Sequence, residues 1–463
     1  MPLCYNVAVL ITNERIVRMS NIVHKKKRLS SSRKIVLGFA ATILVGAILL
    51  MLPISSKSGV VTPFNQALFT STSAVCVTGL VLNDTGSYWS VFGQAVILLL
   101  IQIGGLGVVT VAVSFAMLSG KKISLIQRST LQDAIAAPKV GGIVRLTRFI
   151  LCGTAITELI GTLLMLPVFC RDYGLKGIWM SMFHSVSAFC NAGFDILGTA
   201  EKPFVSLTGY ANNPLINITV MLLIIIGGIG FFTWNDVCTN KLRFRRYSLQ
   251  SKIVLLTTLI LIAAPAVWYF IFDFSDMPTG DGVLGSLFQA VTPRTAGFNT
   301  YDLNKLSSSS KAIMIFLMLV GGSPSSTAGG MKTTTLAVLT LNALSTFKKK
   351  ENAEIFDRRI DNSVIKNAAT VFAMYCSLFF VGGVAICSIE GFSLSDCLFE
   401  TASAVGTVGL TLGITPELGI ASQLILIALM FLGRVGGLTF VYATIVEKRR
   451  SGAMYPLEKI TVG

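Results

Sequence analysis

Long apolar segments follow one another along nearly the whole of this chain. Only 13% of its 463 residues are charged and 53% are hydrophobic, whereas a soluble domain carries about 25% charged residues. Too few charged side chains are present to coat a water-soluble globule, so the pattern predicts an integral membrane protein. Eight segments approach the length of roughly 20 apolar residues that a helix needs to cross a bilayer. They are 35–52, 91–119, 149–170, 214–236, 253–273, 312–341, 366–389 and 420–446.

A shorter apolar stretch lies between the two members of each successive pair of long segments. Each short stretch is too short to cross a membrane and leads into a glycine, which is typical of a re-entrant pore loop. A single stretch of this kind would equally fit a buried connector, but four at matching places favour pore loops. The short stretches are 64–78, 178–192, 282–293 and 394–405.

The four short stretches are copies of one pattern, in which a phenylalanine precedes a glycine by nine or ten residues. The glycines are Gly79, Gly193, Gly297 and Gly409, and they follow one another at intervals of 114, 104 and 112 residues. One unit of about 110 residues is thus used four times. The sequence predicts an all-α integral membrane fold with four helix–pore-loop–helix repeats around one central pore, in pseudo-four-fold symmetry.

The repeat also predicts how the chain is divided. The expected parts are a basic tail over 1–34, repeat 1 over 35–120, repeat 2 over 121–240, repeat 3 over 241–347, repeat 4 over 348–446 and a second tail over 447–463.

The distribution of charge predicts the orientation of the chain. The two tails and the loops between repeats hold 29 Lys and Arg against 9 Asp and Glu, while the opposite side holds 6 against 12. Basic loops stay on the cytoplasmic side of a membrane, so both termini are predicted to be cytoplasmic. The formal charge of +16 is then a topology signal and does not indicate a nucleic-acid partner. The acidic side is expected to concentrate cations mildly.

The residues that usually bind metals or perform catalysis are scarce or isolated. Most of the nine cysteines lie singly in apolar stretches without a CxxC motif, and there are only two histidines. This pattern predicts buried thiols and no histidine-based metal centre. A membrane enzyme would need a nucleophile–base pair or a metal set, and the chain has no HExxH motif or paired intramembrane aspartates. We therefore expect a transport protein and not an enzyme.

The four glycines suggest how the pore would select an ion. A selectivity filter replaces the water around an ion with backbone carbonyls, and glycine adopts a positive φ without steric penalty. The half-helices before the glycines would aim their partly negative C-terminal ends at a cation. The candidate filter residues are Val77, Thr78, Gly79, Asn191, Ala192, Gly193, Thr295, Ala296, Gly297, Thr407, Val408 and Gly409. Hydroxyls expected to support the filter are those of Ser71, Thr72, Ser73, Ser185, Ser187, Thr292, Thr401 and Ser403.

The segment 312–341 is too long for one straight crossing. Pro324 removes a backbone donor and four glycines weaken the helix there. Irregular backbone at membrane depth is tolerated where it lines a water-filled cavity. We predict a break at 321–331 and a loop under the third filter strand; the alternative, a surface turn, would leave two flanks too short to span. The candidate gating residues are Gly321, Gly322, Ser323, Pro324, Ser325, Ser326, Thr327, Ala328, Gly329, Gly330 and Lys332, with Arg434.

Five ionisable residues within or near the membrane need separate explanations. Arg434 lies mid-way along the last span, where a buried cation is expected to face the pore or an acidic partner. Arg294 either supports the third filter strand through charge-assisted hydrogen bonds or is solvated, and Glu400 is either its counter-charge or a hydrated group at the pore mouth. Glu158 fits a structural pair and a functional role equally. His184 is expected to make a structural hydrogen bond, with ion sensing as the alternative.

Four stretches carry a resemblance to a known family. Thr292-Pro-Arg-Thr-Ala-Gly-Phe-Asn299, Thr407-Val-Gly-Leu-Thr411, Ser187-Ala-Phe-Cys-Asn-Ala-Gly-Phe194 and Gln102-Ile-Gly-Gly-Leu-Gly107 are similar to motifs of the Trk/Ktr/HKT potassium transporter superfamily. The chain most resembles bacterial Ktr membrane subunits, from about residue 35 to the C-terminus. The resemblance implies that a glycine in all four repeats selects potassium through filter carbonyls. It also implies an intramembrane loop that obstructs the pore, with Arg434 tied to gating and placed to hold this loop by hydrogen bonds to its carbonyls.

The resemblance carries further expectations about partners and location. It implies a homodimer in a bacterial plasma membrane, surrounded by lipids, with a cytoplasmic RCK-type ring, similar to KtrA and KtrC, that binds ATP or ADP. Potassium would be the transported ion and no cofactor would be covalently bound. The alternatives are a sodium-coupled potassium symporter and a sodium-permeable member of the same superfamily, and sodium remains a candidate activator. Four parallel repeats favour a channel-like pore over the two inverted repeats of many symporters.

Overall fold

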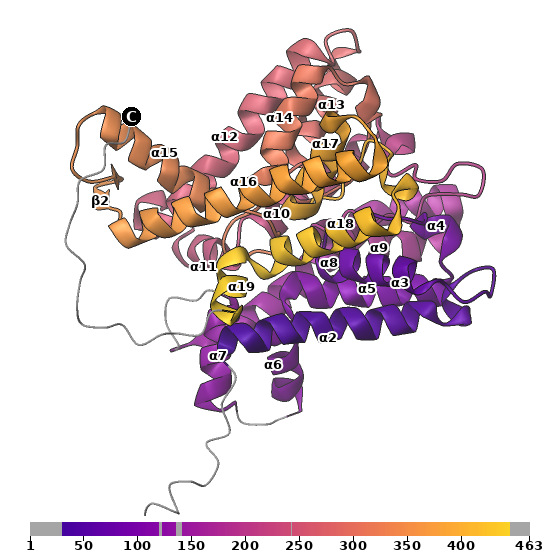
Figure 1. Ribbon diagram of the computed structural model, residues 1–463, viewed down its shortest axis with the longest axis horizontal. Helices are drawn as coiled ribbons and strands as arrows, with labels where there is room; N and C mark the ends of the chain where they lie inside the picture. Colours follow the sequence, from indigo (N-terminus) through magenta and orange to yellow (C-terminus); the bar gives the residue numbers. More distant parts are fainter. Residues whose placement is uncertain (1–29, 120–122, 136–140, 242, 445–463) are drawn as a thin grey trace, which may run out of the picture.

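The structure is a computed structural model that describes residues 30–119, 123–135, 141–241 and 243–444. The described residues are mainly helical (Figure 1), apart from a two-stranded antiparallel pair, β1 (Glu354–Ile355) and β2 (Arg358–Arg359). Most of both predicted tails, 1–29 and 447–463, lies outside the described residues, and the first described helix begins at Ser31, before the predicted boundary at 35.

Each predicted repeat contains a long first helix, a half-helix and a broken second helix, which confirms the predicted fold class. The first helices are α2 (Ser31–Met51), α8 (Ile143–Tyr173), α12 (Leu249–Phe272) and α16 (Asn362–Glu390). The half-helices are α3 (Phe64–Val75), α9 (Lys176–Phe189), α13 (Thr279–Val291) and α17 (Leu394–Gly406). The second helices are α5 (Val91–Leu106) with α6 (Val108–Leu118), α10 (Pro214–Gly228) with α11 (Phe231–Asn240), α14 (Ser308–Leu319) with α15 (Thr333–Phe347), and α18 (Ile420–Val435) with α19 (Gly437–Thr444).

Short helices fill the connections between these elements. They are α4 (Thr85–Tyr88), α7 (Leu125–Ile135) and the 3-10 turns η1 (Pro53–Ser55), η2 (Thr208–Tyr210), η3 (Phe244–Arg246), η4 (Leu303–Lys305) and η5 (Thr415–Glu417).

The second helices are broken in all four repeats. Within the described residues, only the four first helices are long and apolar enough to cross a membrane unbroken. The axis turns by 95° between α5 and α6 and by 97° between α10 and α11. Gly107, Gly230 and Gly436 lie at the breaks of the first, second and fourth repeats with φ of 87°, 89° and 84°. This backbone is accessible to glycine and ends an α-helix, so 91–119 and 214–236 are bent.

In the first, second and fourth repeats, glycines also let the second helix approach the half-helix of its own repeat. A Cβ on Gly104 would lie 2.0 Å from the carbonyl oxygen of Val75, and one on Gly227 would lie 2.0 Å from that of Phe189. The fourth repeat has the same contact, with a Cβ on Gly433 at 2.2 Å from the oxygen of Val405. These separations exclude any side chain, so small residues set the packing of helices around the centre, as is common in membrane proteins.

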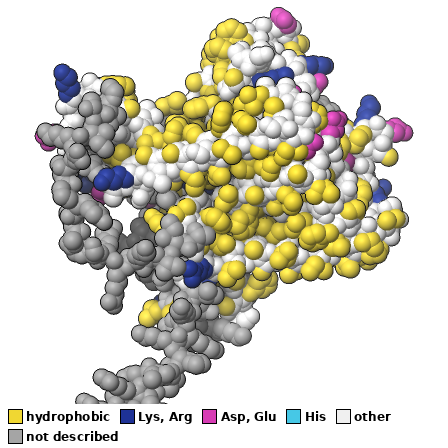
Figure 2. Space-filling model, in the orientation of Figure 1, with side chains coloured by type: hydrophobic (Ala, Val, Ile, Leu, Met, Phe, Trp, Pro, Cys, Tyr) yellow, Lys and Arg dark blue, Asp and Glu magenta, His cyan; other side chains and the backbone are white. Residues whose placement is uncertain are grey.

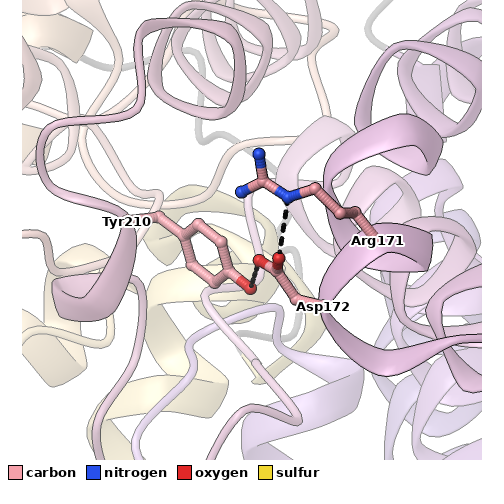
Figure 3. Close-up of polar contacts among 3 residues, drawn as sticks. All are labelled: Arg171, Asp172 and Tyr210. Atoms are coloured by element: carbon pink, nitrogen blue, oxygen red, sulfur yellow. Dashed lines mark hydrogen bonds and ion pairs between the residues drawn. The ribbon is translucent and has the colours of Figure 1, made fainter.

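Acidic side chains connect the first and second helices at the end where the first helices finish. Asp172, at the end of α8, accepts a hydrogen bond from the Tyr210 hydroxyl at 2.9 Å and pairs with the neighbouring Arg171 at 3.1 Å (Figure 3). Asp273 accepts from the amide of Ser307 before α14 at 2.8 Å, and Glu390 accepts from the amide of Gly419 before α18 at 2.9 Å. These carboxylates therefore join the first and second helices of the second, third and fourth repeats.

Hydrophobic side chains cover the flank formed by α2, α16 and α18 (Figure 2), while charged side chains gather toward the two ends of these helices. On α2, for example, Val45 and Ile48 are 57% and 60% exposed. Exposed aliphatic side chains over a whole flank are unfavourable in water. The flank therefore matches the apolar interior of a bilayer or a contact with another membrane protein.

Candidate functional site

The four glycines of the repeat meet in a closed ring at the centre of the molecule. A Cβ on Gly79 would lie 2.4 Å from the oxygen of Ala192, and one on Gly193 would lie 2.6 Å from that of Ala296. The series continues from Gly297 to the oxygen of Val408 at 2.3 Å, and closes from Gly409 to the oxygen of Thr78 at 2.2 Å. Each glycine thus packs against the carbonyl that precedes the glycine of the next repeat. We call these four residues the glycine ring.

The backbone on both sides of the ring has the same unusual conformation in all four repeats. The glycines have φ of 91°, 70°, 76° and 94°. The residue two positions earlier also has a positive φ in each repeat: Val77 at 56°, Asn191 at 58°, Thr295 at 66° and Thr407 at 53°. A β-branched residue such as Val77 is rarely found there, and backbone strain of this kind clusters at functional sites. Alternating the sign of φ turns successive carbonyls toward the same side of a strand, as a filter requires.

Hydroxyls at one equivalent position of each half-helix hold the backbone of the ring. Ser73 and Ser403 accept hydrogen bonds from the amides of Gly79 and Gly409, both at 3.0 Å. Ser187 and Thr292 instead donate to the carbonyls of Phe194 and Phe298, at 2.7 and 2.6 Å.

The other hydroxyls expected behind the filter have different partners. Ser71 and Ser185 bind carbonyls of α2 and α8, while Thr72 bonds within its own helix and Thr401 bonds within its helix and to the carbonyl of Phe379 on α16.

The break between α14 and α15 lies where the sequence predicts it. We call residues 320–332 the α14–α15 loop. Its ends lie side by side, because Val320 and Met331 form a parallel bridge and the amide of Thr333 bonds to Gly322 at 3.1 Å. Between these ends the loop enters the break of the second repeat, where its Ser323 amide bonds to the carbonyl of Gly228 at 2.9 Å. The loop therefore fills space beside the ring and does not form a surface turn.

Two half-buried cations bind carbonyls around this loop. The Arg434 guanidinium donates to the carbonyl of Thr327 in the loop, and to the carbonyls of Gly104 and Gly105 at the end of α5, the latter at 3.0 Å. Lys332 folds back and donates to Ala328 at 2.8 Å and Gly329 at 3.2 Å. The predicted bond between Arg434 and the loop is confirmed, and the carbonyls of α5 are partners that the sequence did not indicate.

Arg294 and Glu400 are both buried, but the structure gives them separate partners. The Arg294 guanidinium contacts the Thr258 hydroxyl at 3.3 Å. Glu400 accepts from the hydroxyls of Thr411 and Thr415, the second at 2.6 Å, and from the amide of Leu412 at 3.2 Å. Within the described residues no ion pair joins Arg294 to Glu400. The counter-charge interpretation of Glu400 is wrong: this carboxylate fixes the segment that follows its own glycine.

His184 and Glu158 have neutral partners. The Nδ1 of His184 donates to the carbonyl of Met180 at 2.7 Å, and its ring lies 5.2 Å from that of Phe169. This contact agrees with a structural role. Glu158 accepts from the Gln102 amide at 3.3 Å, which joins the first and second repeats without an ion pair.

A small pocket opens from the glycine ring on the side of α4, whose first residue Thr85 lines it. We call it the mouth pocket, and its volume is about 80 Å³. It is lined by all four ring glycines and by two acids, Asp84 and Asp195. The Asp84 carboxylate accepts hydrogen bonds from the amides of Ser87 and Phe204, at 2.7 and 2.9 Å. Asp195 is half-buried, and its one hydrogen bond among the described residues comes from the amide of Leu197 at 3.2 Å.

The two acids of the mouth pocket were not among the predicted site residues. Burial and the neighbouring Asp84 carboxylate together raise the pKa of Asp195 to about 7. The position of Asp195, two residues after Gly193, is the signal that would have found it, because the equivalent residue of each repeat lines the same pocket: Val81, Asp195, Asn299 and Thr411.

A larger cavity of about 280 Å³ lies on the other side of the α14–α15 loop. Its lining includes Pro324, Ser325 and Lys332 of the loop, Arg434, and Ile135 at the end of α7. Mouth pocket, glycine ring, loop and cavity thus follow one another between the two ends of the molecule. In the part of the chain that the structure describes, no three or more His, Cys, Asp or Glu side chains lie close enough together to hold a metal ion.

Comparison with known proteins identifies the family. A family model described as TrkH, cation transport protein, matches residues 23–452. The chain belongs to the TrkH family. The TrkH family comprises membrane ion transporters, so this chain is a transporter and not an enzyme.

The curated relatives agree with the predicted resemblance to Ktr membrane subunits. The potassium/sodium uptake protein NtpJ of Enterococcus hirae is 39% identical over 450 residues, which cover 95% of this chain and 98% of that one. The Ktr system potassium uptake protein B of Bacillus subtilis is 39% identical over 448 residues, with the same coverage. The Ktr system potassium uptake protein D of that organism is 33% identical over 445 residues.

A solved structure supports the TrkH fold. The potassium transporter TrkH from Vibrio parahaemolyticus superposes with a TM-score of 0.72 over 91% of this chain and 86% of that one. Its sequence identity is 18%, so the likeness concerns the fold alone.

Proposed function

We propose that this chain is the ion-conducting subunit of a Ktr-type potassium uptake system and that potassium crosses through the glycine ring. The closed order of the ring carries this proposal, because each glycine adjoins a carbonyl of the next repeat and no side chain intervenes. Four half-helices end just before the ring, where their partly negative C-termini favour a cation. Two related uptake proteins are named for potassium alone and one for potassium and sodium.

In this proposal the mouth pocket faces the outside of a bacterial plasma membrane and both termini are cytoplasmic. The excess of basic residues in the loops between repeats supports this orientation. The α14–α15 loop acts as the gate between the ring and the cytoplasmic cavity, and Arg434 and Lys332 hold it closed through its carbonyls. Bonds from cations to carbonyls are strong in an apolar interior, yet a loop of small residues moves at low cost.

We further propose that the chain works as a homodimer and that a nucleotide-binding RCK-type ring docks on its basic cytoplasmic side. The loops between repeats carry the positive charge that such a contact would use. The apolar flank of α2, α16 and α18 offers surface for lipids or for a second copy.

Radioactive rubidium uptake into liposomes that contain the purified chain tests the transport proposal. We expect rubidium to enter down its own gradient without a sodium gradient, and to be displaced by potassium far better than by Na⁺ or Li⁺. The RCK-type partner, once co-purified with the chain, should make this flux respond to ATP and ADP. Uptake that requires a sodium gradient would instead support the sodium-coupled symporter, and full nucleotide control of the isolated chain would contradict the proposed partner.

External pH should change uptake through Asp195. Above about pH 7 its carboxylate is charged and attracts cations to the mouth pocket, and below about pH 7 it is protonated. Lowering the external pH from about 8 to about 6 is expected to reduce rubidium uptake at sub-saturating concentration by about tenfold, the lower end of the range for electrostatic focusing. In the Asp195→Asn variant, rubidium uptake should be slow at every pH and should not change with external pH. Glu201→Gln, which neutralises an exposed acid outside this pocket, should keep the wild-type profile; the same profile in Asp195→Asn would refute the assignment.

A further inference from the structure

Asn191 differs in side-chain chemistry from the equivalent residues of the other three repeats. It is fully buried and lies two residues before Gly193, with φ of 58°. Its counterparts are Val77, Thr295 and Thr407. Val77 has no polar atom to offer, and the hydroxyl of Thr407 has no partner among the described residues. Asn191 alone brings an amide, which both donates and accepts, to this level of the ring.

The Asn191 amide connects two filter strands. Its Nδ2 donates to the carbonyl of Arg294 at 3.3 Å and lies 3.4 Å from the Thr295 hydroxyl. Both partners belong to the third repeat, 103 and 104 residues further along the chain. Because the carbonyl of Arg294 can only accept, this contact also fixes which end of the amide carries the donors. The Nδ2 group therefore holds the third filter strand at a set distance from the second.

The other end of the same amide contacts the α14–α15 loop. The Thr327 hydroxyl lies 3.2 Å from Oδ1 of Asn191 and 3.0 Å from the carbonyl of Phe189 at the end of α9. All three groups are buried, and a Cβ on Gly227 would lie only 2.9 Å from the hydroxyl oxygen of Thr327. The carbonyl of Thr327 is the loop atom that Arg434 binds. One loop residue thus faces a filter strand with its hydroxyl and Arg434 with its carbonyl.

We propose that the contact between Asn191 and Thr327 couples the filter to the loop, so that the position of the loop sets the preference of the ring for potassium over sodium. The inference rests on the proposed function, in which the ring is the filter and the loop is the gate. When the loop withdraws, Oδ1 of Asn191 loses the Thr327 hydroxyl, and the amide is free to turn away from the third strand. Coupling of this kind is reciprocal, so potassium in the ring also favours the closed loop.

Thermal stabilisation of the purified full chain by potassium and by sodium measures this coupling apart from flux. The readout is the ratio of the K⁺ and Na⁺ concentrations that give half of the maximal stabilisation. Thr327→Val removes the hydroxyl while keeping the shape of the side chain, and it is expected to change this ratio by about five- to tenfold, the usual effect of one buried hydrogen bond. Thr327→Ser should restore the wild-type ratio. Thr340→Val is the control and should behave as wild type, because among the described residues the exposed Thr340 hydroxyl bonds to the carbonyl of Leu336 within α15 alone.

A double variant decides whether the effect passes through Asn191. Asn191→Gly fits the positive φ without strain and removes the amide. If the proposal holds, adding Thr327→Val to Asn191→Gly changes the ratio no further. Additive changes, or a wild-type ratio in Thr327→Val, would overturn the coupling. Gly79→Ser distinguishes a failure of the coupling from a failure of the proposed function. If Gly79→Ser also leaves the K⁺ to Na⁺ ratio unchanged, the glycine ring is not the filter. If Gly79→Ser changes the ratio while Thr327→Val does not, the glycine ring is the filter and only the coupling is refuted.

Discussion

Gly79→Ser is expected to lower the preference of the pore for potassium over sodium by about tenfold or more. The new Cβ would lie 2.4 Å from the carbonyl oxygen of Ala192, so this oxygen must move away. The serine would also have to adopt φ of 91°. Strain of this kind costs about 1–3 kcal/mol, and about 1.4 kcal/mol corresponds to a tenfold change in an equilibrium. Competition of Na⁺ against radioactive rubidium uptake in liposomes measures the effect.

A second glycine with a positive φ provides the matched control. Gly59 has φ of 70°, but a Cβ there would meet no atom within 4 Å. Gly59→Ser therefore carries a similar backbone strain without touching the ring, and it should retain wild-type selectivity. If serine at Gly79, Gly193, Gly297 and Gly409 in turn leaves the potassium-to-sodium ratio unchanged, the ring does not select the ion.

Deletion of residues 323–329 is expected to raise basal flux by about ten- to a hundredfold, as when an open state populated at about 1–10% becomes the only state. The geometry favours this deletion, because Gly322 and Gly330 lie in the two adjoining arms of the loop, next to the bridge between Val320 and Met331. Joining them leaves α14 and α15 where they are. The shortened chain should also lose most of the response of its flux to nucleotide, measured in liposomes with the co-purified RCK-type partner.

Arg434→Gln separates the role of the loop from that of its anchor. The loop remains, but the guanidinium bonds to Thr327, Gly104 and Gly105 are lost. We expect basal flux between those of the wild type and the deletion. A shortened chain that folds, reaches the membrane and transports only when its partner is activated would show that the gate lies elsewhere.

The amino-acid sequence by itself determined the features that depend on local chemistry. Apolar length separates spanning helices from half-helices, so the first helices and the half-helices lie close to their predicted places. The repeated Phe-to-Gly spacing identified the glycine ring, because a positive φ and a close carbonyl both require glycine. Pro324 and its neighbouring glycines predicted the break between α14 and α15, since neither residue type supports a helix.

Only the tertiary structure decided which of these pieces touch. The cyclic order of the ring, the bond from Arg434 to Gly105 across 329 residues and the contact between Thr327 and Asn191 across 136 residues join segments that are distant in sequence. Spacing along a helix contains no information about such pairs, because they depend on the angles at which whole helices pack. The same reason explains the correction at Glu400, which found partners beyond its own glycine, because a buried carboxylate is stabilised only by the donors that packing brings to it.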